Sequence, residues 1–250
     1  MLFKTSLLVI FALVFCALVK AKPSLRIVGG SYAEIGQFSH QVALFRNGIY
    51  NCGGSIISSR YILTAAHCVI HDHGTEIYSP NEIIIRVGSM YRLTGGKLVA
   101  VKNIKVHEHY GNFLNDIALL ELEETLTFSS NVQPIALSTD EVPNDAQVII
   151  SGWGRLYENG ENAEWLKYNT VSRLDQADCQ RQIGYGLDSI ICLAHSANKG
   201  ACMGDSGGPA VYNGKLVGIS NFIMDVCGSS KPDAFGKVSY YLDWILSNMN

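Results

Sequence analysis

Short apolar runs separated by Gly, Asn, Ser and Asp dominate the pattern of hydrophobic and polar positions. The last residues, Tyr240–Met249, have instead the pattern of a helix, with Tyr241, Trp244 and Ile245 on one face. Many short strands with turn signals between them favour a β-sandwich or a β-barrel. A boundary between two β units is expected near 137–144, where Ser, Asp, Pro and Asn cluster. The runs with the length and the Val and Ile content of strands are Gln41–Phe45, Tyr61–Ala65, Glu82–Val87, Lys97–Val106, Ile117–Leu122, Gln147–Ser151 and Lys215–Phe222.

Residues 1–21 have the pattern of a secretory signal peptide. Lys4 precedes an apolar run from Ser6 to Val19, and Ala21 is a small residue at a cleavage position, although cleavage after Cys16 or Ala17 also fits the pattern. The run is short for a membrane span, and no second such run follows. We therefore expect a secreted, extracellular protein that does not span a membrane.

Composition and charge limit the class of protein further. Of 250 residues, 48% are apolar and 16% are charged, which is typical of a folded globular chain with one or two domains. The formal net charge is −3, and without residues 1–26 the remaining 15 basic and 22 acidic residues give −7. Nothing in this mildly acidic balance indicates a nucleic-acid partner.

The cysteine count indicates disulfides. Cys16 lies in the signal run, and six cysteines remain, an even number in a secreted chain, which predicts three disulfides with 15 possible pairings. A zinc site is not favoured, because no Cys-x-x-Cys pair occurs.

The segment Gly204-Asp-Ser-Gly-Gly-Pro209 is the strongest candidate for chemistry. Its glycines allow a tight turn that leaves backbone N–H groups free beside the hydroxyl of Ser206. A nucleophile next to donors for a developing oxyanion is the arrangement that acyl transfer needs. The alternative is a glycine-rich turn that happens to contain a serine.

A nucleophilic serine needs a base and an acid that orients it. His67 is the best candidate base, because it ends a strand-like run and lies beside Cys68, which would hold it in place. Asp116 precedes a nearly continuous apolar strand and is the candidate acid, although it could equally cap that strand. The other histidines fit ordinary positions: His40 in the core, and His71, His73, His107, His109 and His195 in loops or at the surface.

Five motifs occur along the chain, in the order Ile27-Val-Gly-Gly30, Thr64-Ala-Ala-His-Cys68, Asn115-Asp-Ile-Ala-Leu119, Gly152-Trp-Gly154 and Gly204-Asp-Ser-Gly-Gly-Pro209. Together they resemble the chymotrypsin/trypsin family of serine endopeptidases, over Ile27 to Asn250. The resemblance implies an all-β fold of two six-stranded antiparallel β-barrels with a C-terminal helix, and one peptidase domain over 27–250. The catalytic residues would lie in the cleft between the barrels.

The resemblance also implies the role of each catalytic residue. Ser206 would attack the scissile carbonyl, His67 would act as general base and then acid, and Asp116 would orient His67. The N–H groups of Gly204 and Ser206 would form the oxyanion hole. Ser220 matches a family serine that forms a hydrogen bond near the buried aspartate.

The same resemblance implies a zymogen with a short propeptide, residues 22–26. Cleavage of the bond between Arg26 and Ile27 would free an ammonium that pairs with buried Asp205. The activating protease would therefore cut after arginine. The expected disulfides, a set that resembles those of invertebrate members, are Cys52–Cys68, Cys179–Cys192 and Cys202–Cys227.

The pocket for the substrate side chain departs from the trypsin pattern. Gly200 stands where trypsins have the aspartate at the pocket floor, so a plain trypsin-like preference for Arg or Lys is not supported. Asp233 falls at another floor position, where it either lines the pocket and attracts a basic side chain, less well than the trypsin aspartate does, or is a solvated loop acid. Phe222 replaces a family glycine and would narrow the entrance or fill it, which favours small or medium P1 residues or a pocket of unusual shape. Met203 would lie at the pocket rim.

We expect polypeptide substrates, an activating protease and possible protein inhibitors as partners, and a monomer without cofactor or metal. The usual pair of calcium-binding glutamates is missing between Val87 and Lys97. A different class of function remains open, a protease-like binding protein that is catalytically weak or inactive. Such proteins usually lack a catalytic residue, whereas all three candidates are present here.

Overall fold

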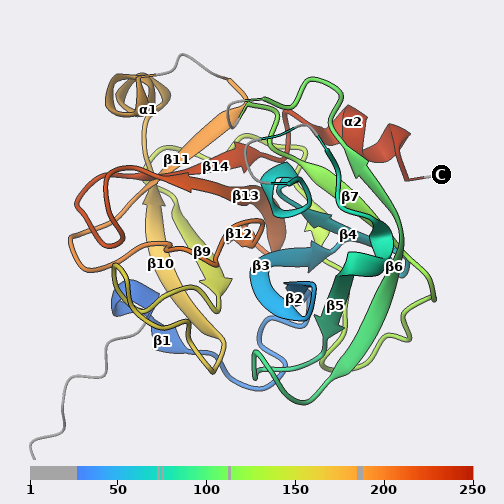
Figure 1. Cartoon of the computed structure of the whole chain (residues 1–250). Coiled ribbons are helices and arrows are strands. Elements are labelled where there is room, and N and C mark those ends of the chain that lie inside the picture. Colours follow the sequence, from blue (N-terminus) through green and yellow to red (C-terminus); the bar gives the residue numbers. More distant parts are fainter. Residues whose placement is uncertain (1–26, 72–73, 75, 112–113, 185–187, 250) are drawn as a thin grey trace, which may run out of the picture.

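Strands β2 to β7 close into a barrel in the order β2-β3-β4-β7-β6-β5 (Figure 1). The computed structural model describes residues 27–71, 74, 76–111, 114–184 and 188–249. The expected signal peptide, 1–21, and propeptide, 22–26 with Arg26, lie outside the described residues. The strands of the first barrel are β2 (Gln41–Arg46), β3 (Ile49–Ile56), β4 (Tyr61–Thr64), β5 (Ile83–Val87), β6 (Lys97–Val106) and β7 (Ala118–Leu122).

The second barrel runs β9-β10-β11-β14-β13-β12 and closes because β9 pairs with both β10 and β12. Two short strands, β1 (Ser31–Tyr32) and β8 (Ala136–Leu137), pair at its margins. The expected fold class, two six-stranded antiparallel barrels and a C-terminal helix, is confirmed. The barrel strands are β9 (Gln147–Gly152), β10 (Lys167–Arg173), β11 (Ile190–Ala194), β12 (Pro209–Tyr212), β13 (Lys215–Ile223) and β14 (Asp233–Lys237).

The strand pattern of the sequence explains the first barrel directly. In β5 the residues at 83, 85 and 87 are buried while 84 and 86 are half-buried, which is the two-residue period of a strand with one face in a core. The C-terminal helix α2 (Leu242–Ser247) places Ile245 in the same apolar cluster, together with Ile219 of β13. The helix and β13 therefore extend the core of the first barrel to the second.

Two local expectations need correction. The structure has a helix α1 (Gln176–Ile183), where the pattern predicted none. Strand β4 ends at Thr64, so a short 3₁₀ turn (η2, Ala66–Cys68) and not the strand itself carries His67. Two further 3₁₀ turns are η1 (Ile27–Gly29) and η3 (Pro80–Glu82). The boundary expected near 137–144 stays a prediction; the stretch lies between β8 and β9.

Helix α1 depends on its N-cap, because it is short and mostly polar. Asp175 accepts hydrogen bonds from the backbone N–H groups of Ala177 and Asp178 at 2.9 and 3.4 Å. We expect Asp175→Ala to lower the free energy of unfolding by about 1 kcal/mol, measured by urea denaturation. Asp175→Asn keeps the acceptor and should lose much less, and equal losses in both variants would contradict a capping role.

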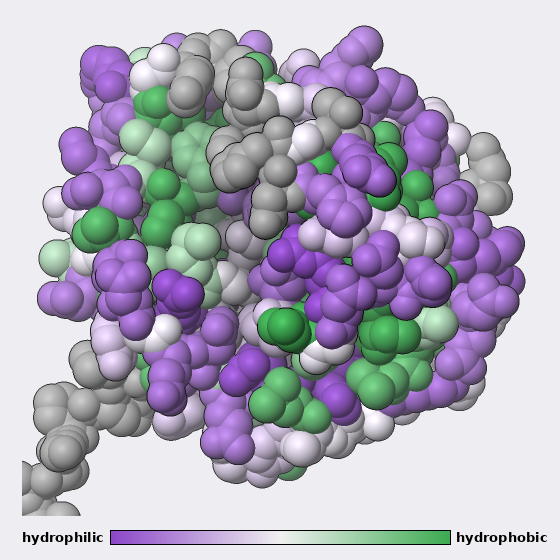
Figure 2. Space-filling model, in the orientation of Figure 1, coloured by the Kyte–Doolittle hydropathy of each residue, from purple (hydrophilic) through white to green (hydrophobic). Residues whose placement is uncertain are grey.

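Hydrophobic side chains on the face drawn in Figure 2 form separate patches between hydrophilic ones. This is the usual appearance of a protein surface in water, where scattered apolar side chains are normal. None of the helices in the described parts of the chain is long and apolar enough to cross a membrane.

Candidate active site

Two tight turns hold Ser206 at the junction of the barrels. The N–H of Asp205 donates to the carbonyl of Cys202, and the N–H of Gly208 donates to that of Asp205, both at 2.9 Å. The carbonyl of Ser206 accepts a hydrogen bond from Gly53 of β3 at 2.8 Å, across the junction. The half-buried Ser206 is therefore positioned by the backbone of both barrels.

Gly207 shows why this segment needs glycine. Its φ is +73°, a backbone conformation that residues with a side chain rarely adopt. A Cβ at this position would overlap the Thr64 hydroxyl and would lie 2.7 Å from the carbonyl oxygen of Gly53. The close approach of the barrels thus requires the glycine that follows Ser206.

His67 and Asp116 are in direct contact. The His67 Nδ1 lies 2.6 Å from Asp116 Oδ2, and the His67 backbone N–H donates to Oδ1 at 2.9 Å. The pairing of β4 with β7, which sets Thr64 opposite Ala118, brings the two residues together, because each lies just beyond a paired strand end. The Asp116 side chain is fully buried, whereas 21% of the His67 side chain is exposed.

This contact sets the protonation of His67. Burial of the ring lowers the pKa of His67, but the charge of Asp116 and its hydrogen bond outweigh burial and raise the pKa above its ordinary value. Arg46 opposes the rise through its positive charge. An imidazole with a carboxylate behind it is stabilised when it takes up a proton, as a general base must.

Two consecutive residues of β3 hold the histidine and the serine. Cys52 forms a disulfide with Cys68, the residue after His67, and Gly53 donates to the carbonyl of Ser206. The structure thus brings together the three residues that the sequence singled out. The Ser206 hydroxyl has no hydrogen-bond partner among the described residues, and catalytic hydrogen bonds often close only around substrate.

The backbone around Ser206 leaves donors unused. Within the described parts of the chain, the N–H groups of Gly204 and Ser206 donate to no acceptor. The carbonyl of Gly204 accepts from the hydroxyl of Tyr50 at 2.7 Å, which fixes the peptide between Gly204 and Asp205. Two free N–H groups beside a hydroxyl are suited to bind an oxyanion.

Asp205 is buried under this loop, with 4% of the residue exposed. It accepts hydrogen bonds from the N–H groups of Gly154 at 2.7 Å and Cys202 at 3.0 Å. Burial raises the pKa of Asp205 to about 7, the negative charge of Asp233 adds to the rise, and these hydrogen bonds oppose it. Its carboxylate forms no ion pair with any residue that the structure describes.

The motif Gly152-Trp-Gly154 makes room for Asp205. A Cβ on either glycine would overlap the Asp205 carboxylate.

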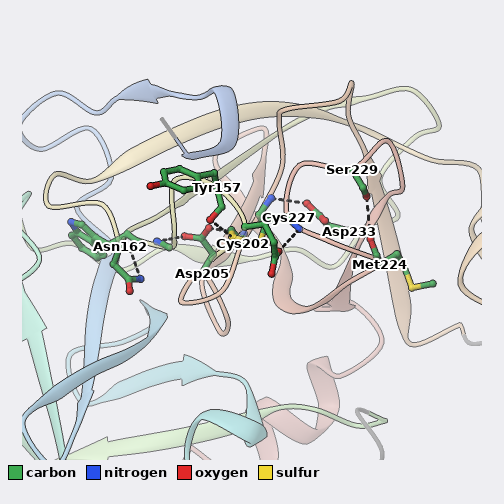
Figure 3. Close-up of a disulfide and its surroundings, with 12 residues drawn as sticks. Tyr157, Asn162, Cys202, Asp205, Met224, Cys227, Ser229 and Asp233 are labelled. Carbon is green, nitrogen blue, oxygen red and sulfur yellow. Dashed lines mark hydrogen bonds between the residues drawn. A yellow bond between two sulfur atoms is a disulfide. The ribbon is translucent and has the colours of Figure 1, made fainter. Parts of the chain in front are cut away.

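Val28, near the start of the described chain, is buried against Cys202 and Cys227. The chain segment after Arg26 therefore lies beside the disulfide that Figure 3 shows next to Asp205.

The expected pocket residues lie on three neighbouring segments. Gly200 and Met203 precede Ser206, and Met203 is 53% exposed. Ser220 is buried on β13, where its N–H donates to Gly208 and its carbonyl accepts from Gly207. Phe222 is half-buried against the apolar cluster around Cys179, Cys192 and Ala234, next to a register shift in β13.

Asp233 is buried, with 4% of the residue exposed, so the alternative of a solvated loop acid is wrong. It begins β14, which lies between β11 and β13, and its carboxylate lies against the segment that contains Gly200 and Ala201. Its Oδ2 accepts the N–H of Ala201 at 2.6 Å. A Cβ on Gly200 would lie 2.6 Å from the same oxygen, so Asp233 occupies the position beside Gly200.

Sequence reasoning missed His195, which it placed in a polar loop. Its side chain is 1% exposed, and its Nε2 lies 3.1 Å from Asp233 Oδ2. No local signal in the sequence marks this histidine, because the contact depends on a turn that brings residues 195 and 200 back to β14.

The three expected disulfides, Cys52–Cys68, Cys179–Cys192 and Cys202–Cys227, are all present. In the described parts of the chain one group has metal-ligand geometry, namely Cys52, His67 and Cys68. Both of its sulfurs are bonded to each other, and a metal binds thiolate. This group is therefore part of the disulfide scaffold.

Comparison with known proteins gives consistent relatives. The family model described as Trypsin matches residues 27–245. The chain is 46% identical over 224 residues to serine protease SP24D of Anopheles gambiae, covering 90% of this chain and 81% of that protein. It is 38% identical over 229 residues to trypsin delta of Drosophila melanogaster, covering 89% and 88%. Mouse neuropsin, a serine protease expressed in the limbic system of the brain, has a similar structure, with a TM-score of 0.81, 27% identity and coverage of 89% of this chain and 99% of that one.

Proposed function

The chain belongs to the trypsin family of serine endopeptidases, and we propose that it is a secreted member, made as a zymogen, whose specificity differs from that of trypsin. It hydrolyses peptide bonds through an acyl-enzyme on Ser206. The observation that carries the proposal is the contact between His67 and Asp116 beside Ser206. Two consecutive residues of β3 hold this group together, because Cys52 is bonded to the neighbour of His67 and Gly53 donates to the carbonyl of Ser206.

In the proposed reaction each residue has one role. His67 takes the proton of the Ser206 hydroxyl as it attacks the carbonyl carbon, and then gives it to the leaving amine. Asp116 keeps the imidazole in the required tautomer and stabilises the imidazolium. The oxyanion is bound by the N–H groups of Gly204 and Ser206, which have no acceptor among the described residues. Water then hydrolyses the acyl-enzyme by the same steps.

Secretion and activation are part of the same proposal. The signal pattern of residues 1–21 and the three disulfides support export to an oxidising compartment. Cleavage after Arg26 frees the ammonium of Ile27, which pairs with Asp205. The buried position of Val28 beside Cys202 supports this step, because it sets the new N-terminus close to the loop that contains Asp205.

The substrates are polypeptides, and the P1 side chain binds beside Gly200, Ser220 and Phe222, with Met203 at the rim. Gly200 brings no charge to the pocket floor, and Asp233 is buried beside it. We infer a preference for uncharged P1 residues. Protein inhibitors that present such a residue would bind to the monomeric enzyme.

Labelling by an organophosphonate tests the proposal. After cleavage at Arg26, confirmed by an N-terminal sequence that starts at Ile27, the protein should take up one label at Ser206 and then lose all peptidase activity. Ser206→Ala is the matched control and should take up none. A correctly cut protein that neither reacts nor cleaves any member of a peptide library would instead be a protease-like binding protein.

A further inference from the structure

The His195 ring lies between the Asp233 carboxylate and the Ser196 carbonyl. Its Nε2 lies 3.1 Å from Asp233 Oδ2, an ion-pair distance, and its Nδ1 lies 3.2 Å from the carbonyl oxygen of Ser196. Nε2 is buried and makes no hydrogen bond of good geometry with any described residue, so its contact with Asp233 is one between charges. Such a contact is attractive when the imidazole is protonated. Burial lowers the pKa of His195, but Asp233 and the Ser196 carbonyl raise it more, so the pKa lies above its ordinary value.

The pair of side chains fills the space beside Gly200. A Cβ at Gly200 would overlap His195 Nε2 and lie 2.6 Å from Asp233 Oδ2, and the φ of Gly200 is +107°. The side chains of His195 and Asp233 are 1% and 6% exposed. The His195 ring therefore covers the Asp233 carboxylate. It occupies the space that a side chain at position 200, six residues before Ser206, would need.

A cation would stabilise the Asp233 carboxylate, because a second buried acid, Asp205, lies near it. Consecutive N–H groups, of Ala201 and Cys202, donate to Asp233 and Asp205, and Figure 3 shows these two acids on opposite sides of the Cys202–Cys227 disulfide. Asp233 adds to the rise in the pKa of Asp205, so the two negative charges act on each other. Among the described residues, His195 is the basic side chain that forms an ion pair with either acid.

We propose that His195 is the built-in counter-ion of Asp233 and a specificity-determining residue, because its ring takes the place that a basic P1 side chain would take. Asp233 then attracts no lysine or arginine from the substrate, although it lies beside the pocket floor. This inference rests on the proposed peptidase function. It accounts for an acid near the P1 pocket without a preference for basic residues.

Replacement of His195 tests the proposal through the ratio of kcat/KM for paired peptides with Arg or Leu at P1. His195→Gln removes the positive charge at nearly the same volume, and His195→Ala also opens space. We expect His195→Gln to raise the Arg/Leu ratio by about 10- to 100-fold, the effect of a close contact between opposite charges. In the double variant His195→Gln/Asp233→Asn the gain should disappear. His109→Gln, at an exposed histidine, is the matched control.

Asp233→Asn alone gives an independent result. Because His195 already neutralises the acid, the Arg/Leu ratio should change by less than about threefold. A loss of tenfold or more would show that Asp233 already binds basic substrates, which would overturn the proposal. An unchanged ratio in both His195 variants would overturn it as well.

Titration with organophosphonate separates this inference from the proposed function. Rates are expressed per reactive Ser206, so partial misfolding of a variant does not alter the ratio. If the wild-type protein fails to react, the proposed function has failed. If it reacts and the ratios do not move, only the role of His195 has failed.

Discussion

We expect Ser206→Ala to lower kcat for peptide hydrolysis by about 10⁶-fold, because removal of the nucleophile disables the whole catalytic group. The fold should not change, because the contact that joins Ser206 to β3 is made by its backbone carbonyl. The measurement is kcat with a peptide substrate after cleavage at Arg26, together with urea denaturation. Ser130→Ala, at an exposed serine, should keep full activity. A loss of only a few fold at Ser206 would exclude it as nucleophile.

Asp116→Asn extends this prediction to the acid. The variant should lower kcat by about 10⁴-fold, because an amide holds the imidazole in the wrong tautomer. The pH profile gives a second readout. His67 must be neutral to act as a base, so kcat/KM falls as the pH drops through the pKa of His67. Asp116 raises that pKa against the effect of burial, so its loss should shift the acid limb to lower pH. An unshifted limb would contradict the assigned pairing.

The first barrel was largely predictable because five of its six strands, all except β3, coincide with short runs that have the length and the Val and Ile content of strands. In β5 the two-residue period of burial is visible as well. Strand β10 was missed because its buried positions include Lys167, Asn169 and Arg173, and hydrophobicity alone gives no signal there. Strand β3 was missed because Gly53 and Gly54 interrupt its apolar pattern. Gly53 is needed at this point because a Cβ would lie 3.1 Å from Gly208 of the other barrel.

The three catalytic candidates were found because each lies in a short motif of the sequence. For Ser206 the motif has a physical reason, because the close approach of the barrels requires glycine at position 207. Helix α1 had usable signals in Asp175 and Gly184, its N-cap and left-handed C-cap, but its polar interior hid them. His195 could not have been found, since its partner lies 38 positions away and is joined to it only by the fold. The pairing of a buried charge is a tertiary property, and local spacing does not encode it.

The second large loss of activity is expected from replacement of Asp205. In the cut protein, Asp205→Asn removes one partner of the proposed ion pair with the Ile27 ammonium. Loss of a buried pair costs about 3–5 kcal/mol, so activity should fall by roughly 200- to 5,000-fold. Arg26→Gln should keep the protein uncut by a protease that cleaves after arginine, and inactive. Asp140→Asn, at an exposed acid, is the matched control and should activate normally.

The pH dependence of the free energy of unfolding should test the same pairing, between Asp205 and the Ile27 ammonium. Burial raises the pKa of Asp205 to about 7 from 3.8, so the folded uncut protein binds a proton that the unfolded chain has released. Its free energy of unfolding should therefore fall by up to about 4 kcal/mol as pH rises from 4 to 7, because each pKa unit is worth about 1.4 kcal/mol. In the uncut protein Asp205→Asn should abolish this fall, and cleavage at Arg26 should do so as well, because the new ammonium stabilises the charged acid. If cut and uncut proteins showed the same pH dependence, Asp205 would not be the partner of Ile27, and activation would have to act on the oxyanion hole by another route.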